Sequence, residues 1–176
     1  AKPKDVSPGP QRDYTKTTLE QYGPDKWEPF PAPKLSALDG ARKRVTLDEY
    51  KGRNVVLIFY LGQECAHCME QLQQASKRKD DFDKHNTVVL AVSSNKPEDN
   101  ADAQKLKPLA LRLLSDERWE NAKRFLSYDD FENLEIHSTI FIDAKSRIRW
   151  VHRGGDPFTD FDGLVKEIER VNRAAE

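Results

Sequence analysis

The stretch "NVVLIFYLGQECAHCMEQLQQ", residues 54–74, carries the strongest indication of the fold in this sequence. It opens with an apolar run of β-branched and aromatic residues without alternation, which is typical of a strand covered on both faces. It continues into "CMEQLQQASKRKDDF" (68–82), where a helix would gather four apolar side chains on one side: Cys68, Leu72, Ala75 and Phe82. The only two cysteines of the chain, Cys65 and Cys68, therefore stand where a buried strand passes into a helix.

Strand and helix patterns alternate on both sides of this stretch. Residues 33–47 predict a short hairpin with Asp39-Gly40 at its turn, because that pair tolerates the positive φ angles of a tight connection. The remaining segments predict strands at 86–93, 108–115, 138–143 and 147–154, and helices at 97–107, 116–126 and 161–174. This order predicts an α/β fold in three layers, with a central mixed β-sheet and helices on both faces.

Composition divides the chain once. Residues 1–33 hold seven of the ten prolines, and this spacing denies helix and sheet interiors their backbone donors, so we expect an N-terminal arm or linker there. Residues 34–176 are expected to form one domain with one core. The single methionine is Met69, directly after the second cysteine, so we expect a processed form or part of a larger polypeptide. The sequence leaves a cytoplasmic and an exported bacterial compartment open.

Charge and hydropathy exclude some classes of partner. Lys and Arg total 29 against 30 Asp and Glu, a formal net charge of -1, so nothing draws the chain globally toward nucleic acid or an anionic membrane. No apolar stretch approaches the ~20 residues that a membrane span needs. The sequence predicts a globular protein without nucleic-acid partner, membrane span or bound cofactor.

The Cys65-Ala66-His67-Cys68 motif predicts redox chemistry. A CxxC at the start of a helix places both sulfurs in the first turn, where free backbone N–H groups and the positive end of the helix dipole favour a thiolate. We expect Cys65 to be the more exposed thiol, which attacks a disulfide, and Cys68 to be the sheltered thiol, which resolves the mixed disulfide.

Two neighbours of the thiols are candidate supporting residues. The ring of His67 could stabilise a thiolate, which would make the disulfide a better oxidant; a solvated ring without redox effect is the alternative. Glu64 is either a proton relay or a solvated loop acid.

From about Phe30 to Val171 the chain resembles the thioredoxin-fold redoxins, in particular the branch near the peroxiredoxins of the alkyl hydroperoxide reductase and thiol-specific antioxidant type. The segment "FPAPKLSALDGARKRVTLDEYKGRNVVLIFY" is similar to their opening hairpin and first central strand. "LLSDERWENAKRFL" resembles the helix after their third strand, and "HSTIFID" a later strand that in peroxiredoxins usually begins Arg-Ser/Ala-Thr-Phe. The resemblance implies a thioredoxin-like fold and an oxidoreductase of thiols, disulfides or peroxides.

The peroxiredoxin pattern aligns only in part around the thiols. Anchored on Phe59-Tyr60, it places Leu61 at the usual Pro, Cys65 at the usual Thr and Cys68 at the peroxidatic cysteine, and the usual Arg falls on His137. These replacements remove groups that would stabilise a reacting peroxide, so thiol–disulfide exchange is the function we expect and peroxide reduction the alternative.

The position before the later strand departs from thioredoxins as well. Their cis-Pro is replaced by Ser138, and because a cis non-proline bond is costly, we expect a trans peptide before Thr139.

Other interpretations stay open for the motif. A lone CxxC supplies two of the four ligands of a structural zinc site. The histidines that would complete the site, His85, His137 and His152, lack paired ligand spacing, so no metal site is predicted. A copper chaperone would need the two cysteines and a distant histidine, for which His137 or His152 would serve. A redoxin-fold binding module with a vestigial CxxC is the non-catalytic alternative. The expected partners are protein or small-molecule thiols and disulfides, and peroxides in the peroxidase reading.

Overall fold

The computed structural model describes residues 19–20 and 28–176. Most of the predicted arm at 1–33 lies outside these residues, and the division of the chain at residue 33 stays a prediction. Among the described helices, none is both long enough and apolar enough to cross a bilayer.

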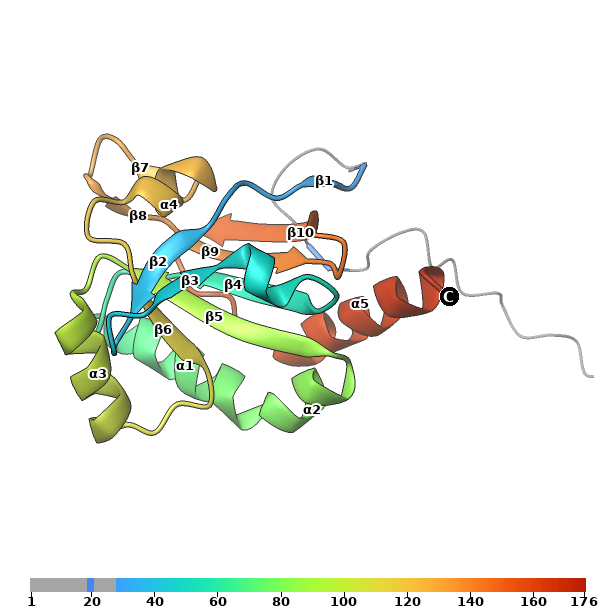
Figure 1. The fold of residues 1–176 in the computed structure, drawn as a ribbon, viewed down its shortest axis with the longest axis horizontal. Helices are drawn as coiled ribbons and strands as arrows, with labels where there is room; N and C mark the ends of the chain where they lie inside the picture. Colours follow the sequence, from blue (N-terminus) through green and yellow to red (C-terminus); the bar gives the residue numbers. More distant parts are fainter. Residues whose placement is uncertain (1–18, 21–27) are drawn as a thin grey trace, which may run out of the picture.

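The centre of the fold is an eight-stranded mixed sheet (Figure 1). Its strand order is β1-β10-β9-β4-β5-β6-β2-β3, with β4, β5 and β6 parallel and β9 antiparallel to β4. The strands are β1 (Phe30–Pro31), β2 (Ser36–Asp39), β3 (Arg44–Thr46), β4 (Asn54–Phe59), β5 (Thr87–Ser93), β6 (Arg112–Ser115), β9 (His137–Ile142) and β10 (Arg147–Gly154). A separate pair, β7 (Tyr128–Asp129) and β8 (Leu134–Glu135), precedes β9.

The sheet separates two apolar layers, as the sequence predicts. In β4, Val56 and Ile58 enter one cluster and Val55 and Leu57 the other, so the continuous apolar run is buried on both faces. The first cluster includes apolar residues of α1 (Ala66–Lys77), α2 (Lys79–Lys84), α3 (Pro97–Leu106) and α5 (Phe161–Ala174). The second includes residues of α4 (Glu120–Arg124), the 3-10 helix η1 (Leu47–Tyr50) and the β2–β3 hairpin. The prediction of a mixed sheet with helices on both faces is confirmed.

The prediction of one helix over residues 68–82 is wrong at both ends. Helix α1 begins at Ala66, two residues earlier, because Cys65 caps it. The helical pattern then breaks at Arg78, whose backbone angles (φ -99, ψ 12) leave the helical range, and α2 continues to Lys84. The four predicted apolar positions are nevertheless all buried: Cys68, Leu72, Ala75 and Phe82.

The helix predicted at 116–126 is shorter in the structure. Trp119 has a left-handed backbone (φ 55), so α4 begins only at Glu120, and the Asp116 carboxylate accepts hydrogen bonds from the backbone N–H groups of Asn121 and Ala122. Asp116 thus accepts hydrogen bonds from the free backbone N–H groups at the start of α4, whereas we expected it to be part of that helix.

The β2–β3 hairpin forms, but its turn differs from the prediction. The residue with positive φ is Arg42 (φ 59), whereas neither Asp39 nor Gly40 has one. Gly40 is needed for space instead, because a Cβ atom there would lie 3.0 Å from the backbone of Ala101 in α3. The glycine permits close packing of the hairpin on this helix.

Candidate active site

The end of β4 and the start of α1 hold the two cysteines. Gly62, in the connecting loop, has φ +114, and a Cβ atom there would lie 2.7 Å from the side-chain oxygen of Asn95. Cys65 is the N-cap residue of α1, and its Sγ atom accepts a hydrogen bond from the backbone N–H of Cys68 at 3.3 Å. The first turn of α1 therefore directs a donor at the sulfur of Cys65, which favours a thiolate there after reduction.

Cys65 and Cys68 form a disulfide with a Cα–Cα distance of 5.2 Å. Cys65 is partly exposed, whereas Cys68 is fully buried within the apolar cluster between α1 and the sheet. A substrate can therefore approach the first sulfur and not the second.

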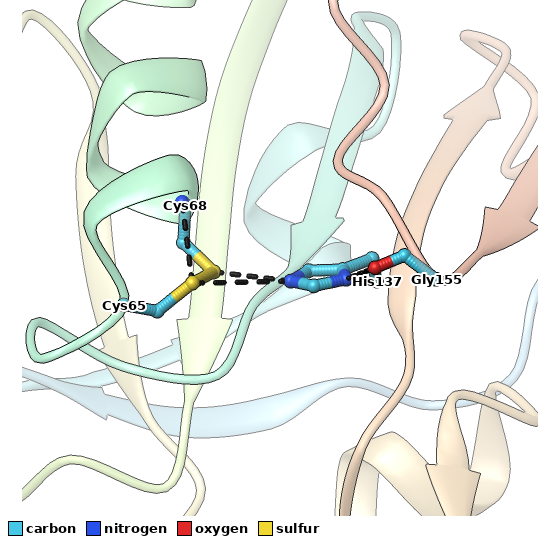
Figure 2. Close-up of a disulfide and its surroundings, with 4 residues drawn as sticks. All are labelled: Cys65, Cys68, His137 and Gly155. Carbon is cyan, nitrogen blue, oxygen red and sulfur yellow. Dashed lines mark hydrogen bonds between the residues drawn. A yellow bond between two sulfur atoms is a disulfide. The ribbon is translucent and has the colours of Figure 1, made fainter.

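His137, the first residue of β9, brings an imidazole ring to this disulfide (Figure 2). Its Nε2 atom lies 3.1 Å from the Cys68 sulfur and 4.0 Å from the Cys65 sulfur. The approach follows from topology: β4 and β9 are antiparallel, so β9 begins at the edge of the sheet where β4 ends and where the cysteine loop leaves it. The sequence aligns His137 with the usual Arg but does not reveal this contact.

A second contact fixes which nitrogen of His137 carries hydrogen in the neutral ring. Nδ1 faces the carbonyl oxygen of Gly155 (Figure 2). The two atoms are 2.8 Å apart, and a carbonyl oxygen can only accept. The neutral ring is therefore protonated on Nδ1, which leaves the lone pair of Nε2 directed at the sulfurs. In this tautomer the ring can take a proton from a thiol, and once protonated it can donate to a thiolate.

Gln71 supports the segment that carries Gly155. Its buried amide nitrogen in α1 donates to the hydroxyl of Thr139 at 3.2 Å and to the carbonyl of Phe158 at 2.9 Å. Sequence reasoning found neither Gln71 nor Gly155. The backbone carbonyl leaves no sequence signal, and Gln71 differs from a surface residue only by its position one turn after Cys68.

The other predicted site residues make no hydrogen bond to the sulfurs in the described parts of the chain. Among the described residues, no hydrogen bond joins His67 or Glu64 to either cysteine, and both side chains are exposed. The Ser138 hydroxyl donates to the carbonyl of Ile136, and Thr139 binds Gln71. No cis peptide occurs in the described parts of the chain, so the bond before Thr139 is trans as expected.

A buried polar pair lies next to the loop that carries the cysteines. Burial raises the pKa of the Tyr60 hydroxyl to about 12, and the Glu135 carboxylate acts in the same direction. Glu135 is itself buried and accepts a hydrogen bond from the backbone N–H of Ser94 at 2.6 Å. Tyr60 therefore stays protonated at neutral pH and cannot serve as the base for the thiols.

Three potential metal ligands meet at the site. The sulfurs of Cys65 and Cys68 and a ring nitrogen of His137 lie within 4.8 Å of one another, the only such group among residues 19–20 and 28–176. His152, the other histidine considered from the sequence, packs against Trp150 and Phe158 instead.

Comparison with known proteins places this chain in a family. The sequence profile of the AhpC/TSA family matches residues 30–151. The chain belongs to the AhpC/TSA family. Among curated proteins it is 31% identical to Peroxiredoxin-2 of Bos taurus over 134 residues, 69% of this chain and 66% of that protein. It is 26% identical to the chloroplastic Peroxiredoxin Q of Oryza sativa subsp. japonica, covering 69% of this chain and 56% of that protein. The chain thus spans less than two thirds of these relatives.

Solved structures show the same fold for this AhpC/TSA chain. The peroxidoxin BcpB of Mycobacterium tuberculosis superimposes with a TM-score of 0.72 at 16% identity, covering 84% of this chain and 97% of that one. The reduced 2-Cys peroxiredoxin of Plasmodium vivax gives 0.73 at 19% identity, covering 82% and 96%. The resemblance to peroxiredoxins of thioredoxin-like fold is confirmed, and members of the family are oxidoreductases.

Proposed function

We propose that this AhpC/TSA protein is a thiol–disulfide oxidoreductase that cycles Cys65 and Cys68 between a dithiol and a disulfide. The observation that carries the proposal is the Cys65–Cys68 disulfide with the Nε2 lone pair of His137 3.1 Å from the buried sulfur. A vestigial CxxC would not need an imidazole oriented toward it by a second hydrogen bond.

The first step uses the exposed sulfur. The Cys65 thiolate, stabilised by the N–H of Cys68, attacks one sulfur of a substrate disulfide. A bond forms between Cys65 and that sulfur, and the substrate bond breaks. The second substrate sulfur leaves with the electron pair and takes a proton from solvent.

The second step uses the buried sulfur and His137. Nε2 accepts the proton of the Cys68 thiol, and the resulting thiolate attacks the Cys65 sulfur of the mixed disulfide. The Cys65–Cys68 bond forms, and the remaining substrate thiolate leaves and receives the proton held by His137. Two electrons have then passed from the dithiol to the substrate, and an external thiol must reduce the protein for another cycle.

Peroxide reduction is the second candidate. It is supported by membership of the AhpC/TSA family and by the alignment of Cys68 with the peroxidatic position. Against it stand the burial of Cys68 and the replacements Leu61, Cys65 and His137 at the usual Pro, Thr and Arg. We therefore place disulfide substrates first and peroxides second.

Insulin reduction tests the proposal. Catalytic amounts of the protein, added to insulin with dithiothreitol, should accelerate precipitation of the reduced insulin chains. Cys65→Ser and Cys68→Ser should each abolish the acceleration. Reduced Cys68→Ser, freed of dithiothreitol and then mixed with insulin, should trap a mixed disulfide on Cys65 that is visible by mass spectrometry. His85→Ala, a histidine at the opposite end of β5, is the matched control. If insulin precipitates no faster with the protein and dithiothreitol than with dithiothreitol alone, although both cysteines are shown to be reduced, the proposal is overturned.

A further inference from the structure

We propose that the reduced site binds one Cu(I) ion through the sulfurs of Cys65 and Cys68 and the Nε2 atom of His137. Thiolates are the ligands that soft cations such as Cu(I) prefer, and imidazole is suited to copper as well. The binding does not require the oxidoreductase activity proposed above, so the two can fail separately.

The distances between the three ligand atoms fit one metal ion. Sulfur ligands lie about 2.3 Å and imidazole nitrogens about 2.0–2.1 Å from a bound metal, which sets each nitrogen–sulfur distance at about 3.6–3.8 Å for trigonal or tetrahedral angles. The Nε2 atom of His137 lies 3.1 Å and 4.0 Å from the two sulfurs, on either side of that range. Small movements of the ring or the sulfurs would equalise the two distances.

The orientation of His137 also suits a ligand. A metal-bound histidine usually donates its other ring N–H to a fixed acceptor, which sets the tautomer and the direction of the ring. The contact between Nδ1 and the Gly155 carbonyl supplies that acceptor at 2.8 Å. The lone pair of Nε2 is thereby available without any change of tautomer.

The state of the two sulfurs decides whether the ion can bind. Two sulfurs on one metal lie about 3.8–4.0 Å apart, so they cannot also be joined in the disulfide. Binding replaces the two thiol protons, which pass to solvent, and no electron is transferred. The resulting site has two thiolates, a neutral imidazole and one monovalent cation. Copper and disulfide formation therefore compete for the same pair of sulfurs.

The number of ligands favours Cu(I) over zinc. Structural zinc is almost always bound by four protein ligands, and the described residues supply three at this site. Cys68 is fully buried and Cys65 partly exposed, so the ion would enter past Cys65 and rest against the apolar cluster beneath α1. Burial of the Cys68 sulfur limits the access of water to the metal from that side.

Competition with a chromophoric chelator tests the site. The protein, reduced and freed of reductant without oxygen, is titrated into Cu(I) bicinchoninate kept reduced by ascorbate, and the loss of colour is followed. One equivalent of copper per chain should leave the chelator. The same protein in its disulfide form is the matched control and should remove none. X-ray absorption of the copper complex should show two sulfur neighbours and one nitrogen neighbour.

Substitutions separate the three ligands from their neighbours. Cys65→Ser and Cys68→Ser should remove binding, and His137→Ala should weaken it by at least about tenfold, since even the partners of metal-bound histidines are worth 10–100-fold. His67→Ala and His85→Ala should bind copper as the wild type does. Equal affinity of His137→Ala and wild type, or no transfer of copper to the reduced protein, would overturn the proposal.

Discussion

The Nε2 atom of His137 lies 3.1 Å from the sulfur of Cys68, although 69 positions of sequence separate the two residues. The contact joins the first turn of α1 to the first residue of β9. It gives the buried thiol, rather than the exposed one, the nearer base. The two cysteines therefore differ both in exposure and in access to a proton acceptor.

This difference predicts the order in which the thiols react. In the reduced protein at neutral pH, iodoacetamide should label Cys65 several-fold faster than Cys68, because Cys65 is partly exposed and receives the Cys68 N–H, whereas Cys68 is buried. Peptide mass spectrometry after short exposures measures both rates in one sample. Faster labelling of Cys68 would instead favour the peroxiredoxin assignment of the nucleophile.

Substitution of His137 should change both rate and potential. His137→Ala should lower the turnover of insulin reduction by roughly 100-fold, the lower range of what a positioned acid–base group contributes. The disulfide should also become less oxidising by about 20–30 mV, which corresponds to loss of about 1–1.4 kcal/mol of stabilisation of the reduced form. A redox titration against glutathione resolves a shift of this size.

The same titration on His67→Ala tests the interpretation drawn from sequence alone. Because this side chain is exposed and bonds neither sulfur among the described residues, we expect no measurable change in potential. A shift at His67 as large as that at His137 would contradict the roles assigned by the geometry.

Hydrogen peroxide should oxidise the dithiol at a rate near that of an ordinary thiolate. Leu61, Cys65 and His137 replace the usual Pro, Thr and Arg, so donors that would stabilise the reacting peroxide are missing. Rapid-quench alkylation measures the loss of free thiol.

Restoring the peroxiredoxin pattern provides the complementary experiment. The triple variant Leu61→Pro, Cys65→Thr, His137→Arg should lose the Cys68 thiol to peroxide at least about tenfold faster than wild type, since one such donor is worth 10²–10³ in rate. Fast, saturating peroxide consumption by the wild type would show that the replacements do not matter.

Stability should decrease on mild acidification because of His152. Burial lowers the pKa of this ring from its usual 6.5, although the Glu20 carboxylate opposes the shift. Below pH 6.5 the unfolded chain then binds more protons than the folded one, so stability is lost as the pH falls from 7 toward 5. Carboxylates contribute at lower pH, near 4.

Urea unfolding of wild type and His152→Gln at pH 7 and pH 5 measures this effect. The variant should lose less stability than wild type between the two values, and the matched variant His85→Gln should lose as much as wild type. Equal losses in all three proteins would assign the pH dependence to other groups.

Local patterns in the sequence predict much of this fold. The apolar runs of β4 and β5 and the amphipathic stripe of α5 each reflect burial of neighbouring positions, so they are recognisable within a single segment. The break at Arg78 is not recognisable in this way, because no proline or glycine marks it and the apolar pattern continues into α2.

The candidate site is predictable only where it is local. The CxxC motif identifies both sulfurs, and its place at the start of a helix predicts that they are reactive. The sequence leaves His137 and His152 as alternatives for the imidazole near them, since the choice depends on which strand pairs with β4 and in which register. His67, adjacent in sequence, makes no hydrogen bond to either sulfur among the described residues, whereas His137 is brought close by strand pairing.

The register of that pairing determines on which side of the sheet the His137 ring lies. Thr139 and Phe141 lie on the α1 side of β9, where Gln71 and the first apolar cluster meet them, and His137 shares that side because side chains alternate along a strand. Inserting or deleting a single residue early in β9 would turn the imidazole to the opposite side of the sheet, away from the sulfurs. A natural variant with such a length change would keep an intact CxxC and yet lack its histidine, so the motif by itself is an incomplete guide to which related chains can perform the proposed reaction.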